Sequence, residues 1–338
     1  MADARRDIRL QAVVVAGGVL LMAVKFLAWK LTHSNTILSD ALESIVNVVA
    51  GSFALYSLWL AAKPRDREHP YGHGKVEFIS AGVEGGLVTL AGGLIIYRAL
   101  KAWLGEHHLH DLGEGILLTL AAGLLNLLMG LALLVRGRKS HSLAMQASGT
   151  HLLSDAWTTA AMLTGLLVIW LTGLTWLDNL FAMLFGGFII VQGIRVVRRS
   201  VAGIMDETDM DVAAEVVQML EQHREPHWVD LHNFRVIKFG RTLHIDCHVT
   251  LPWYHDLKWS HDAINTMEEL VNERSDRDVE LFIHMDPCVP PASCAICTFD
   301  ACDRRKAARQ GRAWSRPDGR DCRRDARSPA GRRRRIDS

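Results

Sequence analysis

Two apolar stretches of the sequence contain pairs of polar residues that stand one helical turn apart. Glu43 and Asn47 form one pair, and His151 and Asp155 form the other. Residues at positions i and i+4 share one face of a helix, so each pair can aim two ligand atoms at one point. Four nitrogen and oxygen ligands from two helices suit a tetrahedral Zn²⁺ or a similar first-row ion. A polar network that only joins helices is the alternative interpretation.

Transmembrane helices are the elements that must position these pairs. A spanning helix needs about 20 mostly apolar residues. Six stretches meet this requirement: 11–32, 37–62, 76–100, 115–136, 143–171 and 174–197. The pairs then lie about seven to thirteen residues into their spans, which at about 1.5 Å per residue is near the bilayer centre. Two further polar residues inside the spans, Glu84 and Asn126, suit packing or polar networks.

The distribution of basic residues orients the six spans. Cytosolic loops of membrane proteins are rich in Lys and Arg. Six spans put both termini on the same side of the membrane. Thirteen Lys and Arg residues lie at the span ends on that side, and three lie at the span ends on the other side. We therefore expect a multi-pass membrane protein with both termini in the cytosol. All six cysteines then face the cytosol, where a disulfide framework is not expected.

The loop between the second and third spans contains further candidate ligands. Asp66, His69 and His73 stand close together in a short polar segment and could converge on one ion. Histidine and carboxylate side chains are ordinary ligands for first-row metal ions. A solvated loop that binds nothing tightly is the alternative interpretation.

The soluble part of the sequence predicts a small α+β domain. Residues 211–224 and 258–274 favour helices, and residues 231–239, 242–250 and 279–284 favour strands. Apolar and polar residues alternate in the second strand, as expected for a strand with one buried face. The order helix, strand, strand, helix, strand suits a ferredoxin-like unit.

Four cysteines follow this domain with the spacing C-x5-C-x2-C-x4-C: Cys288, Cys294, Cys297 and Cys302. Four thiolates this close together could wrap one Zn²⁺, although Cys-x-x-Cys also occurs in redox motifs. Reduced free thiols are the alternative interpretation. The remaining residues, 303–338, are rich in Arg and lack apolar periodicity, so we expect a disordered tail. Such a tail either touches anionic lipid or is simply solvated.

Over about residues 10–302 the sequence resembles the cation diffusion facilitators, a family of proton-coupled exporters of divalent metals. The resemblance rests on Ser39-Asp40-Ala41, on Tyr71-Gly72-His73-Gly74-Lys75, on the His151 and Asp155 pair, and on His284-Met285-Asp286-Pro287-Cys288. It implies that the two intramembrane pairs form the transport site and that the loop holds a secondary metal site. Glu43 and Asn47 depart from the family pattern, which usually has Asp or His at the first position and Asp at the second.

The resemblance also implies that the soluble domain forms a homodimer with a regulatory metal at its interface. Five residues match the ligand positions of the family: His232, His248, His261, His284 and Asp286. Scattered surface histidines are the alternative interpretation.

We therefore expect a six-helix transmembrane transport domain at residues 1–205, a cytosolic metal-binding and dimerisation domain at residues 206–302, and the Arg-rich tail at residues 303–338. The expected fold class is a membrane all-α bundle followed by an α+β, ferredoxin-like domain. The expected function is export of divalent metal cations, with Zn²⁺ as the first choice, in exchange for protons by alternating access. A passive divalent metal channel and a non-transporting metal sensor are the alternatives.

In this interpretation a divalent first-row metal is both substrate and regulator, and no organic cofactor is expected. The expected partners are metal ions, protons, a second copy of the chain and the lipid bilayer, and not nucleic acid. The sequence shows no nucleophile and base set of the kind that hydrolytic enzymes use, so we do not expect an enzyme. The expected location is the plasma (inner) membrane of a bacterium.

Overall fold

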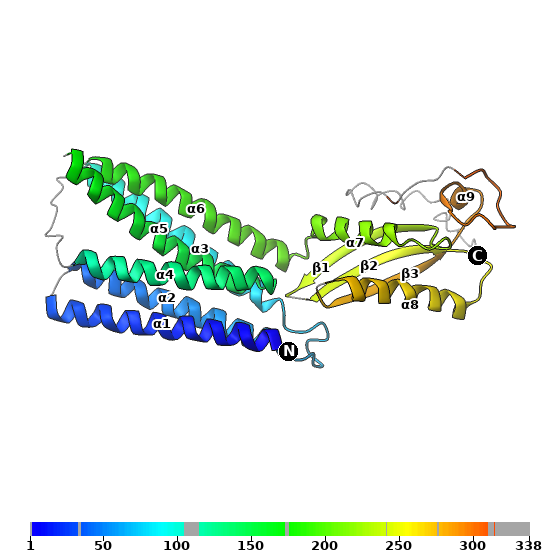
Figure 1. Ribbon diagram of the computed structural model, residues 1–338, viewed down its shortest axis with the longest axis horizontal. Coiled ribbons are helices and arrows are strands. Elements are labelled where there is room, and N and C mark those ends of the chain that lie inside the picture. The colour runs from blue at the N-terminus through cyan, green and yellow to red at the C-terminus, as the bar shows by residue number, and fades with distance from the viewer. Residues whose placement is uncertain are drawn as a thin grey trace, which may run out of the picture. The chain divides into compact units, whose positions relative to one another are not determined.

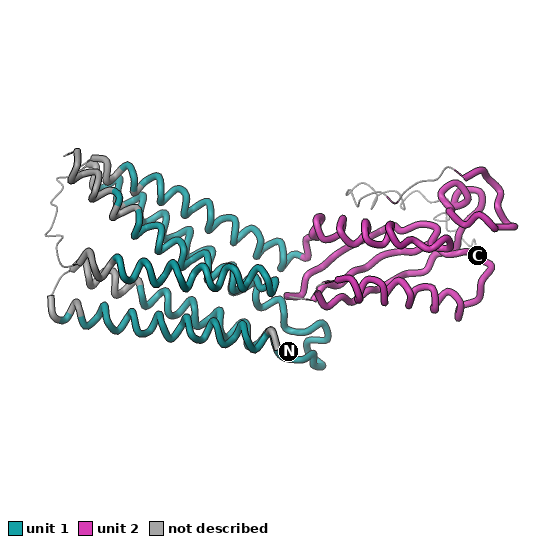
Figure 2. The backbone as a smooth tube through the Cα atoms, viewed as in Figure 1, with its two compact units in different colours: residues 1–205 teal, residues 206–338 magenta. Residues whose placement is uncertain are grey.

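The computed structural model describes residues 2–32, 35–104, 115–172, 176–240, 242–275, 277–309 and 314. The chain divides into two compact units, residues 1–205 and residues 206–338 (Figure 2). The described part of the first unit is built from helices, and the second unit contains a β-sheet with helices packed on it (Figure 1).

Six long helices form the first unit where it is described, and they run lengthwise beside one another (Figure 1). Their bounds are α1 (Ala2–Thr32), α2 (Asn35–Ala61), α3 (Val76–Leu104), α4 (Gly115–Lys139), α5 (Leu143–Thr172) and α6 (Trp176–Ile204). Each predicted span overlaps one of these helices. Within the described residues, α1 to α4 each contain a segment long and apolar enough to cross a membrane. The predicted membrane bundle is therefore confirmed as a fold.

Pairing of the helices brings the polar residues of α2 and α5 within reach of each other. The most extensive contacts join α3 with α6, α4 with α5, and α1 with α2, while α5 also packs against α2 and α3. Glycines permit the closest of these approaches. A Cβ atom added at Gly85 would lie 3.0 Å from the carbonyl oxygen of Gly193, and one at Gly92 would lie 2.8 Å from that of Gly186. Glycine, which has no side chain, allows two helices to pack this closely.

The second unit has the predicted order αββαβ. Its elements are α7 (Met210–Gln222), β1 (Asp230–Phe239), β2 (Thr242–Leu251), α8 (Leu257–Arg274), β3 (Val279–Pro287) and the short helix α9 (Ala292–Ile296), which was not predicted. The strand order is β1-β2-β3. Strand β1 pairs with β2 in antiparallel fashion, and β2 pairs with β3 in parallel fashion.

One face of this sheet forms the core of the unit. Leu243, Ile245, Cys247 and Val249 of β2 are buried there with residues of α7 and α8, which contact each other and so cover the same face. The alternation predicted for β2 is therefore confirmed. His244 lies on the other, polar face but is buried, because it packs against the rings of Phe239 and Phe282.

Described residues beyond the four cysteines contact the domain, whereas we expected disorder from residue 303 onward. The guanidinium of Arg305 donates hydrogen bonds to the carbonyl oxygens of Cys294 at 2.9 Å and Phe299 at 2.7 Å. Trp314 is 9% exposed and packs in the domain core, with the guanidinium of Arg224 4.4 Å from its ring centroid. These residues pack against the domain because each has a specific partner there. Backbone carbonyls accept the hydrogen bonds of Arg305, and the ring of Trp314 is buried beneath a guanidinium.

Candidate metal centres

Three polar side chains meet where α2 packs on α5. The Nδ2 atom of Asn47 donates a hydrogen bond to Oδ2 of Asp155 at 2.7 Å. The Oδ1 atom of Asn47 lies 2.8 Å from Nε2 of His151, which is 7% exposed. Asn47 therefore bridges the two polar residues of α5. Three of the four predicted transport ligands therefore meet at one point, where His151 is buried and the other two are partly buried.

The fourth predicted ligand of this site is Glu43. It belongs to α2, but its side chain lies outside the part of the chain that the structure describes. Its spacing from Asn47 is the basis for placing it on the same helix face. Its role as a ligand therefore stays a prediction.

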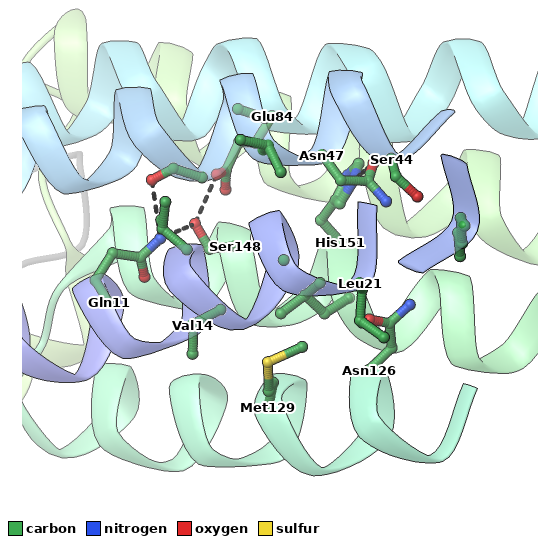
Figure 3. Close-up of a pocket in the computed structure, with 17 residues that line it drawn as sticks. Gln11, Val14, Leu21, Ser44, Asn47, Glu84, Asn126, Met129, Ser148 and His151 are labelled. Atoms are coloured by element: carbon green, nitrogen blue, oxygen red, sulfur yellow. Dashed lines mark hydrogen bonds between the residues drawn. The ribbon is translucent and has the colours of Figure 1, made fainter. Parts of the chain in front are cut away.

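A cavity of about 50 Å³ adjoins the Asn47 and His151 contact, and a chain of polar side chains lies along it (Figure 3). Gln11 of α1 donates to Oγ of Ser148 at 3.3 Å, and Ser148 donates to Oε1 of Glu84 at 2.6 Å. Glu84 is 1% exposed, and its Oε2 atom has no hydrogen-bond partner among the described residues.

Sequence reasoning treated Glu84 as a packing or network residue, and the hydrogen bond to Ser148 agrees with a network. It did not place Glu84 beside the predicted transport site. Ser148, the hydrogen-bond partner of Glu84, was the feature of the sequence that pointed to this position. It stands three residues before His151 and therefore shares its helix face. Glu84 lines the same cavity as Asn47 and His151, and buried carboxyl groups at membrane depth are usually functional, so we add Glu84 to the candidate centre.

The loop between α2 and α3 brings its three predicted ligands together. Suitable ligand atoms of Asp66, His69 and His73 all lie within 4.8 Å of one another. The Nε2 atom of His73 lies 3.3 Å from Oδ2 of Asp66, and the two imidazole centroids are 4.4 Å apart. Gly72 has φ +88°, a conformation that L residues with side chains rarely adopt, and it turns the chain between the histidines.

Backbone amides in this loop favour the ionised form of the Asp66 carboxyl group. The Oδ1 atom of Asp66 accepts hydrogen bonds from the amides of His69 at 2.7 Å and Glu68 at 3.0 Å. The hydrogen bond from the His69 amide is the largest cause that lowers the pKa of Asp66 below its usual value. Asp66 is therefore ionised at neutral and mildly acidic pH, as a metal ligand must be.

The polar face of the sheet holds a second compact group, in which Asp286 contacts three imidazoles. Its Oδ2 atom lies 2.9 Å from Nδ1 of His248 and 3.2 Å from Nε2 of His232. Its Oδ1 atom lies 3.2 Å from Nδ1 of His284. The ligand atoms of His232, His248 and Asp286 lie within 4.8 Å of one another, and His284 stands at the more exposed edge.

Strand pairing explains why residues so far apart in sequence meet here. His232 of β1 pairs with His248 of β2, and His248 pairs with His284 of β3. A bulge in β1 between His232 and Arg235 contains Asn233 at φ +51°. A bulge inserts one extra residue and so changes which face a side chain occupies. The three histidines form a row across the sheet as a result.

His261, the remaining predicted ligand of the soluble domain, is not brought to this group. It is exposed on α8, and its Nε2 atom lies 3.3 Å from Nδ2 of Asn265 one turn further along the helix. Helix α8 covers the core face of the sheet, whereas the group lies on the opposite, polar face. Within one chain His261 therefore stands apart from the other four residues.

The four cysteines after β3 line one small cavity of about 20 Å³. Cys294 and Cys297 are buried, while Cys288 and Cys302 are partly exposed, and all four are free thiols. The described residues contain two groups of three ligand atoms within 4.8 Å of one another, and the cysteines are not one of them. The cysteine cluster is therefore looser than the two histidine and aspartate groups.

These features define a membrane protein with a buried histidine and carboxylate centre and a separate α+β domain that has its own candidate metal centre. Residues 12–205 match the family model described as the cation efflux transmembrane domain, and residues 208–288 match that of the cation efflux protein, cytoplasmic domain. The chain belongs to the cation efflux family, a family of membrane transporters of metal cations rather than of enzymes. The resemblance to the cation diffusion facilitators is thereby confirmed.

Individual relatives agree with this assignment. The chain is 32% identical to the uncharacterised transporter sll1263 of Synechocystis sp. over 283 residues, which cover 83% of this chain and 91% of that protein. It is 27% identical to the cation-efflux pump FieF of Shewanella oneidensis, over 81% of this chain and 91% of the pump. It is 29% identical to the metal tolerance protein C1 of Arabidopsis thaliana, over 83% of this chain and 62% of that protein.

Proposed function

We propose that this protein exports divalent metal cations from the cytosol in exchange for protons, with Zn²⁺ as the first candidate substrate. The observation that carries the proposal is the bridge that Asn47 makes between His151 and Asp155 where α2 packs on α5. The histidine and the carboxylate of α5, with the facing amide of α2, supply the nitrogen and oxygen ligands that first-row divalent ions prefer. Glu43, one turn before Asn47, is the proposed fourth ligand.

The charges of these four residues suit a divalent ion. With Glu43 and Asp155 ionised and His151 neutral, two negative charges balance the two positive charges of the metal. Asn47 contributes a neutral carbonyl oxygen. Protonated ligands cannot coordinate, so protons and metal compete for the same atoms. A site that opens alternately to each side of the membrane would therefore release metal where protons displace it.

The other two centres receive supporting roles in this proposal. The loop group of Asp66, His69 and His73 is a secondary site on the cytosolic side. The group of His232, His248 and Asp286, with His284 beside it, binds a regulatory ion. That group lies on the sheet face that α7 and α8 leave uncovered, so a second copy of the domain could close over it as a homodimer. His261 would join it only through such an assembly.

The proposed location is the inner membrane of a bacterium, with both termini in the cytosol. The excess of Lys and Arg at one set of span ends supports this orientation. The match to the cation efflux transmembrane domain and the similarity to the cation-efflux pump FieF of Shewanella oneidensis support an exporter embedded in a membrane.

Metal flux into proteoliposomes tests the proposal. Zn²⁺, Co²⁺, Ni²⁺, Fe²⁺, Cd²⁺ and Mn²⁺ would be compared with and without a pH gradient. An exporter of this kind shows flux that the gradient accelerates. Flux that ignores the gradient indicates a passive channel, and metal binding without flux indicates a sensor. Asn47→Ala should reduce flux, whereas Ser52→Ala, an exposed residue on the same helix, serves as the matched control.

A further inference from the structure

The segment after β3 is the part of the second unit that neither transport nor dimerisation explains. The match to the cytoplasmic domain of the family ends at residue 288, which is the first of the four clustered cysteines. The segment nevertheless has a defined conformation that includes α9. An ordered extension with four cysteines and little apolar core of its own needs another source of stability.

Contacts hold this extension against the domain. The amide of Cys288 donates to the carbonyl of Leu251 at 2.8 Å at the end of β2. The hydroxyl of Thr298 donates to the carbonyl of Pro226 at 3.2 Å, and a guanidinium nitrogen of Arg224 donates to the carbonyl of Ile296 at 3.4 Å. These bonds place the extension over the loop between α7 and β1.

All four thiols of the extension line the same cavity, together with Tyr254, Arg304 and Arg305. The cavity volume of about 20 Å³ is room for one ion or one water molecule, and not for a cluster of several metal atoms. Cys294 and Cys297 are buried beside this cavity, and a buried thiol gains from a cation that stabilises its thiolate.

Donors around the cavity suit thiolate sulfur. The amide of Lys306 lies 3.4 Å from Sγ of Cys294, and the hydroxyl of Tyr254 lies 3.7 Å from Sγ of Cys302. Four thiolates around a divalent ion leave a charge of −2, and the guanidinium of Arg305, which donates to the carbonyl oxygens of Cys294 and Phe299 beside the cavity, offsets part of it. Hydrogen bonds and charges of this kind orient and stabilise metal ligands.

We propose that Cys288, Cys294, Cys297 and Cys302 bind one Zn²⁺ as a structural tetrathiolate centre that fastens the extension to the cytosolic domain. Zinc–sulfur bonds of about 2.3 Å need the sulfur atoms closer together than they stand in the structure. Cysteine has a single side-chain torsion that positions its sulfur, so rotation between staggered rotamers can bring the sulfur atoms inward. This centre does not depend on the proposed transport activity.

Cobalt absorption of the full-length, reduced protein in detergent tests the proposal, because thiolate ligands give Co²⁺ a charge-transfer band that histidine and carboxylate ligands do not. We expect the band in the wild type, its loss in the Cys294→Ser, Cys297→Ser variant, and its retention in the His248→Ala, Asp286→Asn control. Excess Zn²⁺ should abolish the band by displacing the cobalt. It should also protect four cysteines from maleimide, counted by mass spectrometry.

Several results would overturn the proposal. One is the absence of a charge-transfer band in the wild type when thiol titration shows that the cysteines are reduced. Another is a band that survives the double serine substitution. Iron with cluster absorption in the purified protein would also overturn it in favour of an iron–sulfur centre. Because the first and third measurements use the wild type, the test stands even if the serine variant fails to fold.

Discussion

Asp286→Asn is the substitution that tests the cytosolic histidine group most directly. The change keeps the size and shape of the side chain and removes its negative charge. In the structure this one carboxylate contacts the imidazoles of His232, His248 and His284 at 2.9–3.2 Å. Asparagine can satisfy some of these contacts but offers a metal only a neutral oxygen. We therefore expect the variant to fold and to bind Zn²⁺ weakly.

The expected size of the effect follows from linkage. A metal present at 100 times its Kd stabilises the folded state by about 2.7 kcal/mol. Loss of a residue that only supports a metal ligand weakens metal binding by up to about 100-fold. Asp286 would contact the metal directly, so we expect its loss to weaken binding by about 100-fold. The same metal concentration then stabilises the variant by only about 0.4 kcal/mol. For a domain of this size these energies correspond to an increase in Tm of about 10–20 °C for the wild type and about 2–3 °C for the variant.

Thermal unfolding of a fragment covering residues 206–314, with and without Zn²⁺, measures this difference. The fragment extends to Trp314 because that residue packs in the domain core. Asp246→Asn is the matched control, since Asp246 is an exposed carboxylate on the same strand as His248 but outside the group. Zinc at the cysteines would add the same increase in Tm to both variants, so the difference between their increases measures the histidine group alone. Equal zinc-dependent increases in Tm for the two variants would show that Asp286 is not a ligand.

Four further outcomes are expected. Asp155→Ala should abolish flux at normal expression, because it removes the charged partner of Asn47; wild-type flux would refute the four-ligand site. Asn47→Asp should strengthen zinc binding and steepen its pH dependence; an unchanged metal preference and pH profile would show that Asn47 is not a ligand. His248→Ala with His284→Ala should lower the metal sensitivity of transport but leave flux at high metal; unchanged sensitivity would refute regulation. Asp209→Ala should cost the cytosolic domain about 1–2 kcal/mol at pH 7 in denaturant unfolding, as a lost helix cap does, and the cost should shrink below about pH 4; a pH-independent cost would contradict this.

The sign of the last effect follows from the surroundings of Asp209. Burial acts to raise the pKa of this carboxyl, but the ion pair with Lys238 and the amides of Val212 and Asp211 at the start of α7 outweigh it and hold the pKa below its usual value. A carboxyl whose pKa is depressed in the folded state stabilises that state above its unfolded pKa. The contribution disappears as the pH falls through the folded value.

The membrane unit was predictable because its signals are local. Span length and apolar composition predict the helices, and a spacing of four residues puts His151 and Asp155 on one helix face. Depth in the bilayer then matched this pair with Asn47, and the structure brings the three together. The position of Glu84 was not predictable in the same way. It depends on how α3 packs against α5, and no spacing within one helix determines that contact.

Composition describes an average, so it did not predict the contacts that individual residues make after Cys302. The Arg-rich sequence after Cys302 indicates disorder when counted as a whole. Individual residues nevertheless have specific partners, as Arg305 has in the carbonyls of the cysteine segment and Trp314 has in the guanidinium of Arg224. The average composition of more than thirty residues does not reveal a single buried indole or a guanidinium with several acceptors.

For His232, His248 and His284 the limit of sequence-based prediction is different. The three residues were identified as candidate ligands, but their position on one face of the sheet was not predicted. Phe234 and Val236 of β1 are buried in the core, and a regular strand would place His232 on that same core face since side chains alternate with a period of two. The bulge at Asn233 adds one residue between His232 and Arg235 and shifts His232 to the polar face, opposite His248. Deleting Asn233 should therefore turn His232 toward the core and remove it from the group without changing any ligand. The candidate metal centre depends as much on this one inserted residue as on the histidines themselves.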